Sequence, residues 1–213
     1  MAKIAVSTDK LKELLKSTKI ADRNKGVKII QKDKIKELGD DLFILLNKEY
    51  EKGKSWQLIV ACMNTLGDIN YVKSKDFLYE ICEKNLAHDM VTASASAAYC
   101  RIVKNNKNDV KPVLDLLSFG NFAVVNGALK SLAIDKVIPN DEEKIEIIKK
   151  IDCFTPKREV GYSDVRVGLV VACAGWLSLP EVNAFLSKTL EESDYQPLTK
   201  AAEMAIKGKY YNI

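Results

Sequence analysis

The 213-residue chain contains few of the residues that interrupt helices. It has five prolines and ten glycines, which is low for an all-β protein built on many turns. Aromatic residues make up 8% of the chain while apolar residues make up 47%, so aliphatic side chains must supply most of the core. This balance is typical of packed helices, and it excludes a disordered chain because enough apolar surface is present to offset the ordering entropy.

Histidine is almost absent, which limits the chemistry that the chain can carry. His88 is the only one, and the five cysteines form no Cys-x-x-Cys pair, whereas structural zinc needs four such ligands close together. A thiol–base pairing of His88 with Cys82 or Cys100 is an alternative, but a turn or helix-cap histidine is favoured. The Gly-rich phosphate-binding motifs and the Gly-x-Ser-x-Gly motif are also missing. We therefore expect no metal, no cofactor and no enzymatic activity.

Long apolar runs are missing as well. The longest, Val167–Leu177, is about half of the ~20 residues that a membrane span requires. The first nine residues run into charge without an apolar core, which does not fit a signal peptide. An odd number of cysteines argues against a secreted protein held by disulfides. These absences predict a soluble cytoplasmic protein with no membrane contact.

Arginine is scarce, and the positive charge is unevenly distributed. The net charge is +4, and only four of the 33 basic residues are arginines. Residues 1–53 carry 13 basic and 9 acidic side chains, whereas residues 54–213 carry 20 of each. Because planar guanidinium groups are preferred for binding phosphates and base edges, a lysine-dominated surface is more typical of a solvated face.

What the sequence does contain is an internal repeat. Five nine-residue segments align without gaps: 58–66, 94–102, 124–132, 169–177 and 198–206. The fourth position is always tiny: Ala61, Ala97, Gly127, Ala172 and Ala201. The fifth is always small: Cys62, Ala98, Ala128, Cys173 and Ala202. The ninth is always a branched aliphatic: Leu66, Ile102, Leu132, Leu177 and Ile206. Small residues at adjoining positions allow helices to approach closely, and an aliphatic side chain on the same face fills the gap between them.

Amphipathic segments follow the small-residue helices. The pattern predicts these second helices at 73–84, 108–119, 141–151 and 180–192. Asn140 is the expected N-cap of the third, and Pro180 fits the first turn of the fourth. Trp176 is expected to pack between repeats, while Trp56 is expected to be partly exposed.

The small-residue first helix, a turn at Thr65–Asp68 and the following amphipathic helix resemble a HEAT repeat. The resemblance covers about Trp56 to Ile206, leaves HEAT and armadillo-like repeats as alternatives, and implies an all-α solenoid of stacked helical hairpins. We expect one solenoid domain over 1–213, with four to five repeats in 54–213. The helices predicted at 9–16, 20–31 and 33–50 would form a variant or capping repeat in 1–53.

An insertion interrupts the repeat spacing. Gly127 and Ala172 are 45 residues apart, more than any other neighbouring pair of anchors, because residues 152–164 intervene. The insertion contains two aromatic and two basic residues: Phe154, Lys157, Arg158 and Tyr162. Insertions in repeat arrays map to loops on one face, often the binding face, although a merely tolerated insertion is an alternative.

The amphipathic second helices are expected to supply the surface that flanks this insertion. Their outward positions lie off the apolar stripe of each helix. The positions expected to contact a partner are Lys75, Tyr79, Lys111, Asp115, Glu146 and Lys149.

Solenoids present a long concave surface that suits proteins which grip other macromolecules. The resemblance therefore implies a non-catalytic protein-binding module, either a scaffold, an adaptor or an inhibitor of the immunity type, whose partner is another protein. One alternative is a nucleic-acid-binding protein similar to the HEAT-like alkylpurine DNA glycosylases. It would use the stretch Lys10–Lys36, which holds nine lysines and Arg23. A lyase-like chaperone for a bound chromophore is a third alternative.

Overall fold

The computed structural model describes residues 6–158 and 162–213, and every regular element in these two ranges is helical. The first half contains α1 (Thr8–Lys16), α2 (Ile20–Asp33), α3 (Gly39–Lys52), α4 (Trp56–Asp68), α5 (Lys75–Lys84) and α6 (Met90–Val103). The second half contains α7 (Lys111–Phe119), α8 (Phe122–Ile134), α9 (Asp141–Cys153), α10 (Arg166–Ala172), α11 (Pro180–Glu192) and α12 (Gln196–Ile206). Three short 3-10 helices precede or extend them: η1 (Lys36–Leu38), η2 (Val72–Ser74) and η3 (Cys173–Gly175). The all-helical fold predicted from the sequence is confirmed.

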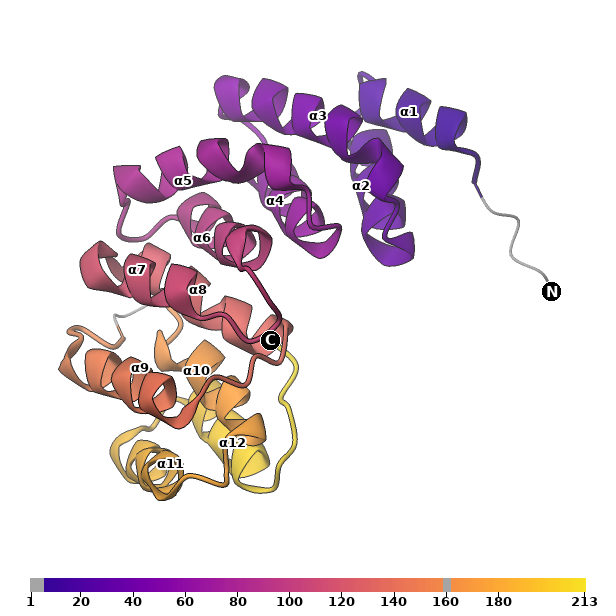
Figure 1. Ribbon diagram of the computed structural model, residues 1–213. Coiled ribbons are helices and arrows are strands. Elements are labelled where there is room, and N and C mark those ends of the chain that lie inside the picture. The colour runs from indigo at the N-terminus through magenta and orange to yellow at the C-terminus, as the bar shows by residue number, and fades with distance from the viewer. Residues whose placement is uncertain (1–5, 159–161) are drawn as a thin grey trace.

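The helices form two rows. The even-numbered helices make an inner row, in which α2, α4, α6, α8, α10 and α12 each pack against the next. Odd-numbered helices make an outer row, and α1, α3, α5, α7 and α11 each pack on the even-numbered helix that follows. The rows curve, with the even-numbered helices on the inner side (Figure 1). Each hairpin therefore begins with its amphipathic helix and ends with its small-residue helix, the reverse of the order expected from the sequence.

The small residues of the repeat lie where inner helices meet. All five residues at the fifth position are at most 1% exposed, as predicted. A Cβ atom added to Gly127 would overlap the carbonyl oxygen of Ala93 in α6, and one added to Gly168 would lie 2.6 Å from the backbone nitrogen of Lys130 in α8. The backbones of α6, α8 and α10 therefore approach too closely for side chains at these two positions.

The aliphatic residue at the ninth position of the repeat was predicted to fill the gap between helices, and this prediction is wrong for Leu177 and Ile206. Ile206 is 43% exposed, whereas Ala202 and Ala205 are fully buried, so the last residue of α12 lies off the face that packs on neighbouring helices. Leu177 is half-buried because α10 ends at Ala172 and tightens into η3, so Leu177 lies beyond the helix and off its buried face. At the fourth column Ala61 is half-buried, whereas Ala97, Gly127, Ala172 and Ala201 are buried.

Two predicted boundaries are also wrong. The segment 33–50 is not one helix, because α2 runs to Asp33 and is ended by Lys34 in the left-handed conformation (φ 50°), and α3 begins only at Gly39. The expected turn at Thr65–Asp68 is the last turn of α4, since Gly67 remains helical and packs against Ala98 of α6.

Several side-chain predictions are confirmed. The Asn140 side chain accepts a hydrogen bond from the Glu143 backbone N–H at 2.9 Å, and the Glu143 side chain accepts one from the Asn140 backbone N–H at 3.0 Å. The two bonds make a complete capping box. Pro180 begins α11. Trp176 is fully buried and its Nε1 donates to the Val137 carbonyl at 2.7 Å, while Trp56 is 49% exposed. None of the described helices combines the length and the apolar character needed to cross a bilayer.

Candidate binding groove

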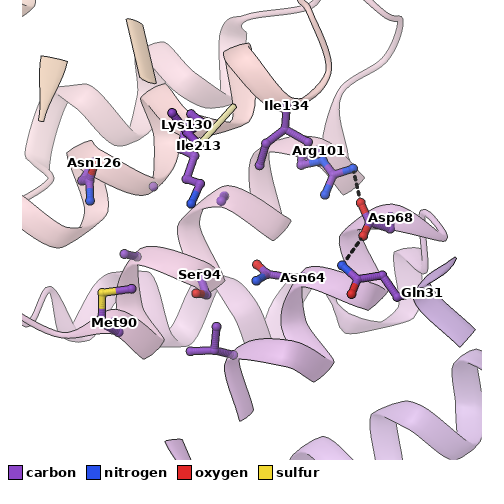
Figure 2. A pocket seen from close by; sticks show the side chains of 14 residues that line it. Gln31, Asn64, Asp68, Met90, Ser94, Arg101, Asn126, Lys130, Ile134 and Ile213 are labelled. Carbon is purple, nitrogen blue, oxygen red and sulfur yellow. Dashed lines mark hydrogen bonds and ion pairs between the residues drawn. The ribbon is translucent and has the colours of Figure 1, made fainter. Parts of the chain in front are cut away.

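A groove of about 310 Å³ lies on the inner row, across α4, α6 and α8, and we call it the inner groove. Its floor is made of the small residues of α6 and α8, namely Ala93, Ser94, Ala97 and Gly127. Because these residues have almost no side chain, the groove exists where larger residues would fill the space. Figure 2 shows the surrounding side chains, with α4 and α8 contributing the two walls.

Four polar side chains that have no protein partner among the described residues face into the inner groove. Asn64 comes from α4, Ser94 from α6, and Asn126 and Lys130 from α8 (Figure 2). Within the described residues, none of these four side chains makes a hydrogen bond or an ion pair. Each amide can donate and accept a hydrogen bond, and the ammonium group can donate three. The groove therefore presents unused hydrogen-bonding capacity from three consecutive inner helices.

A chain of charged side chains lies at one end of the inner groove. Gln31 of α2 donates to Asp68 of α4 at 2.7 Å, and Arg101 of α6 donates to the other oxygen of Asp68 at 2.8 Å. Arg101 also donates to Asp135, at the end of α8, at 2.9 Å, and Lys104 pairs with the same carboxylate. These contacts fix four inner helices relative to one another. Two positive and two negative charges cancel, so the unpaired Lys130 gives the groove its net charge.

A smaller hollow of about 140 Å³ continues the inner groove beyond Met90, and we call it the aromatic hollow. It shares Met90, Ala93 and Asn126 with the inner groove. Tyr162 stacks on His88 with ring centroids 4.3 Å apart, and both rings lie beside Phe122. The two hollows thus form one continuous surface along the inner row.

The structure separates the insertion residues that were predicted to bind a partner. Only Tyr162, which is 43% exposed, reaches the inner surface, through the aromatic hollow. Phe154 caps α9 and is half-buried against the core. Lys157 donates to the Asp152 carbonyl at 3.0 Å. Arg158 pairs with Asp194 at 3.2 Å and lies over the Tyr195 ring at 4.3 Å. Residues 159–161 of the insertion lie outside the described residues.

The predicted flanking residues all lie on the outer row, away from the inner groove. Lys75 and Tyr79 line a hollow beside Tyr99, with the two tyrosine rings 5.2 Å apart. Lys111 and Asp115 of α7 form an exposed ion pair with each other at 3.1 Å. Glu146 and Lys149 are exposed on α9. These six side chains therefore lie on three different outer helices, α5, α7 and α9.

The nucleophilic groups behind the inner groove are held protonated. Cys62 and Cys100 are buried, and desolvation raises the pKa of both thiols far above the usual value. Burial likewise raises the pKa of Cys82 to about 12. Among the described residues, no cluster of three or more histidine, cysteine, aspartate or glutamate side chains could hold a metal ion. The residues that line the groove offer hydrogen bonding, the positive charge of Lys130 and apolar contact.

Sequence reasoning missed the four polar residues of the inner groove. Asn64, Asn126 and Lys130 stand inside mainly apolar helices, and Ser94 lies within a run of small residues. A polar residue on the apolar, small-residue helix of a repeat was therefore the available signal. It was overlooked because the insertion and the amphipathic helices carried more conspicuous charges and aromatic residues. No family model, no curated protein and no solved structure matches this chain.

Proposed function

We propose that the chain is a HEAT-like solenoid that acts as a non-catalytic protein-binding module and holds an extended segment of another protein in the inner groove. The observation that carries this proposal is the set of unpaired polar side chains, Asn64, Ser94, Asn126 and Lys130, on three consecutive inner helices. Their polar atoms are not among the buried side-chain atoms that lack a partner in the described chain, so water can reach them. A ligand that enters the groove can replace this water with its own hydrogen-bonding groups.

An extended polypeptide offers the matching chemistry. Each peptide unit presents one N–H and one C=O, which a single asparagine amide can satisfy together. The floor of Ala93, Ala97 and Gly127 allows a backbone to approach closely. Met90 and Ile134, which are 55% and 40% exposed, offer apolar contact at the rim. Lys130 favours an acidic or carbonyl-rich segment over a basic one.

Nucleic acid fits this surface less well. Among the described residues that line the inner groove, Lys130 is the one unpaired cation, because Arg101 is neutralised by Asp68 and Asp135. In the basic stretch Lys10–Lys36, the only arginine is Arg23, and its side chain is buried and bound to Glu49 and to two backbone carbonyls. Phosphate-binding surfaces require many exposed cations along one path.

Site-specific photocrosslinking tests the proposal. A photoreactive amino acid is placed at Asn64 or Asn126 in the groove, and at Asn47, a half-exposed asparagine of the outer helix α3, as the matched control. In the cell that makes the protein, we expect the same protein adduct from both groove positions and none from Asn47. The adduct should resist nuclease treatment.

A groove variant separates specific from incidental capture. Asn64→Leu combined with Asn126→Leu removes both amides while keeping similar side-chain size, and should reduce an adduct formed from a probe at Met90 by at least tenfold. Adducts from Asn47 alone, or adducts that nuclease removes, would contradict the proposal. So would an undiminished adduct in the double variant.

A further inference from the structure

The segment that follows α12 returns along the inner row. Gly208, with φ 67°, reverses the chain, and the Lys209 N–H donates to the Met204 carbonyl at 2.9 Å. Residues Tyr210–Ile213 then run without regular structure past Val171 of α10 to the end of α8, and the yellow trace in Figure 1 leads from α12 back toward α8. They end at the inner groove, where Ile213 is one of the lining residues beside Lys130 and Ile134 (Figure 2).

This segment is held by its side chains. The hydroxyl of Tyr210 lies 2.5 Å from where a Cβ atom of Gly175 would be, so the glycine provides the space for the ring. Lys136 places its ammonium group 4.7 Å from the centre of the same ring. Tyr210 and Tyr211 are half-buried against the core, and Tyr210–Ile213 share a hollow with Ala133, Ile134 and Val171.

Backbone contacts contribute little to holding it. No hydrogen bond joins Tyr210–Ile213 to the rest of the described chain. Ile213 is still 39% exposed, and its neighbour Ile134 is 40% exposed. The segment is therefore docked by apolar and cation–π contact alone, which another segment of similar character could replace.

We propose that Tyr210–Ile213 is an internal occupant of one end of the inner groove, and that the segment bound from a partner is an extended aromatic–aliphatic peptide that competes with it. The inference rests on the proposed function. It adds the type of sequence that the groove recognises and a way in which the chain limits a partner's access to the groove. Ile134 lines both the groove and the hollow under the segment. A peptide that enters the groove along α6 and α8 must therefore displace Ile213 to reach Ile134.

Tethering makes this competition effective. A short flexible connection gives the attached segment an effective concentration in the millimolar range. A free peptide with the same contacts must reach that range before it occupies half of the sites. A partner of higher affinity displaces the segment, and its apparent affinity equals its intrinsic affinity multiplied by the fraction of molecules in which the site is open.

Binding of a defined peptide to the full-length chain tests the inference. The probe is the hexapeptide Gly-Lys-Tyr-Tyr-Asn-Ile, which copies residues 208–213. The open variant carries Tyr210→Ser and Ile213→Ser, and both proteins are followed by two-dimensional NMR during titration to about 2 mM peptide, the range set by the tether. We expect the amide signals of Ala133, Ile134 and Lys130 to shift in the open variant, with at least tenfold weaker binding to the unmodified chain.

Matched variants locate the site. Adding Ile134→Lys to the open variant should abolish binding, whereas adding Ile44→Lys should not, because Ile44 is 66% exposed on the outer helix α3. The peptide Gly-Lys-Ser-Ser-Asn-Ser should not bind. The NMR spectra report the folded state of every variant directly.

Three results would overturn the inference: no shifts in the open variant at the highest peptide concentration, equal binding to both proteins, or shifts confined to residues outside the groove. The outcome is distinguishable from that of the photocrosslinking experiment. If the peptide does not bind but groove adducts form, the protein-binding proposal stands and the self-occupied site is wrong. If the peptide binds but adducts form only from Asn47, the self-occupied site stands and the proposed function is wrong.

Discussion

Gly127 and Gly168 lie where α8 meets its two neighbours in the inner row. A glycine inside a helix costs about 1 kcal/mol relative to alanine, because it loses more backbone freedom on folding. Glycine is nevertheless required at position 127, because a Cβ atom there would overlap the carbonyl oxygen of Ala93 and lie 2.9 Å from the Cβ of Ser96. The depth of the inner groove depends on the same close approach.

Replacing Gly127 by alanine should therefore destabilise the protein, although the substitution favours an isolated helix. We expect the free energy of unfolding to fall by about 1–3 kcal/mol, the usual cost of overpacking. Urea unfolding followed by circular dichroism measures it. Gly26→Ala in α2 is the matched control, since the atoms nearest to its Cβ would be side-chain atoms of Leu14 and Leu15, at 3.2 Å, rather than backbone. A Gly127→Ala variant as stable as the unmodified chain would show that α6 and α8 are not in close contact.

At the scale of helices, the charged chain from Gln31 to Lys104 connects four members of the inner row. The side chain of Arg101 is only 10% exposed, and those of its partners Asp68 and Asp135 are 21% and 18% exposed. A partly buried pair is screened less by water than a surface pair, and removing one member leaves the others without compensation.

Arg101→Met should lower the free energy of unfolding by about 1–3 kcal/mol, because it removes one of two hydrogen-bond donors from each of two partly buried carboxylates, Asp68 and Asp135. Lys111→Met is the control, since Lys111 and Asp115 form a pair that is 77% and 60% exposed, and its loss should cost no more than about 0.5 kcal/mol. The comparison uses urea midpoints at low and at high salt. Equal effects of the two substitutions would mean that the charged chain does not hold the inner row together.

The helices themselves could be predicted from the sequence because the apolar pattern and the caps are local signals. Asn140 shows this, since its spacing to Glu143 is enough to predict where α9 begins. The boundary at Gly67 could not be predicted, because its helical conformation depends on Ala98 in the next hairpin. For the candidate site, polar residues inside mainly apolar helices were a visible signal, but their meeting was not. Asn64 of α4 comes close to Asn126 and Lys130 of α8 only through packing between hairpins, which the spacing along the chain does not reveal.

At the scale of the whole molecule, the excess positive charge and the inner groove lie in different places. The excess lies in residues 1–53, whereas the inner groove lies mainly on α4, α6 and α8. In the basic stretch, Lys10 is paired with Glu13, and Arg23 is buried with Glu49. The positive charge that faces solvent there comes from exposed lysines such as Lys25, Lys28 and Lys32. A field of this kind attracts polyanions weakly at low salt and is screened within about 8 Å at physiological salt.

Nucleic acid should therefore bind weakly, through this region, and without preference for sequence. Fluorescence anisotropy with labelled duplex and single-stranded DNA measures it at about 50 and 150 mM salt. We expect no sub-micromolar complex at the higher salt, and a slope of log K against log salt near −0.9 for each phosphate neutralised. Replacing Lys25, Lys28 and Lys32 by glutamine should make that slope shallower, whereas Lys130→Gln in the groove should leave it unchanged. A sub-micromolar complex at the higher salt that loses affinity with Lys130→Gln would place nucleic acid in the inner groove, and the protein-binding proposal would then be wrong.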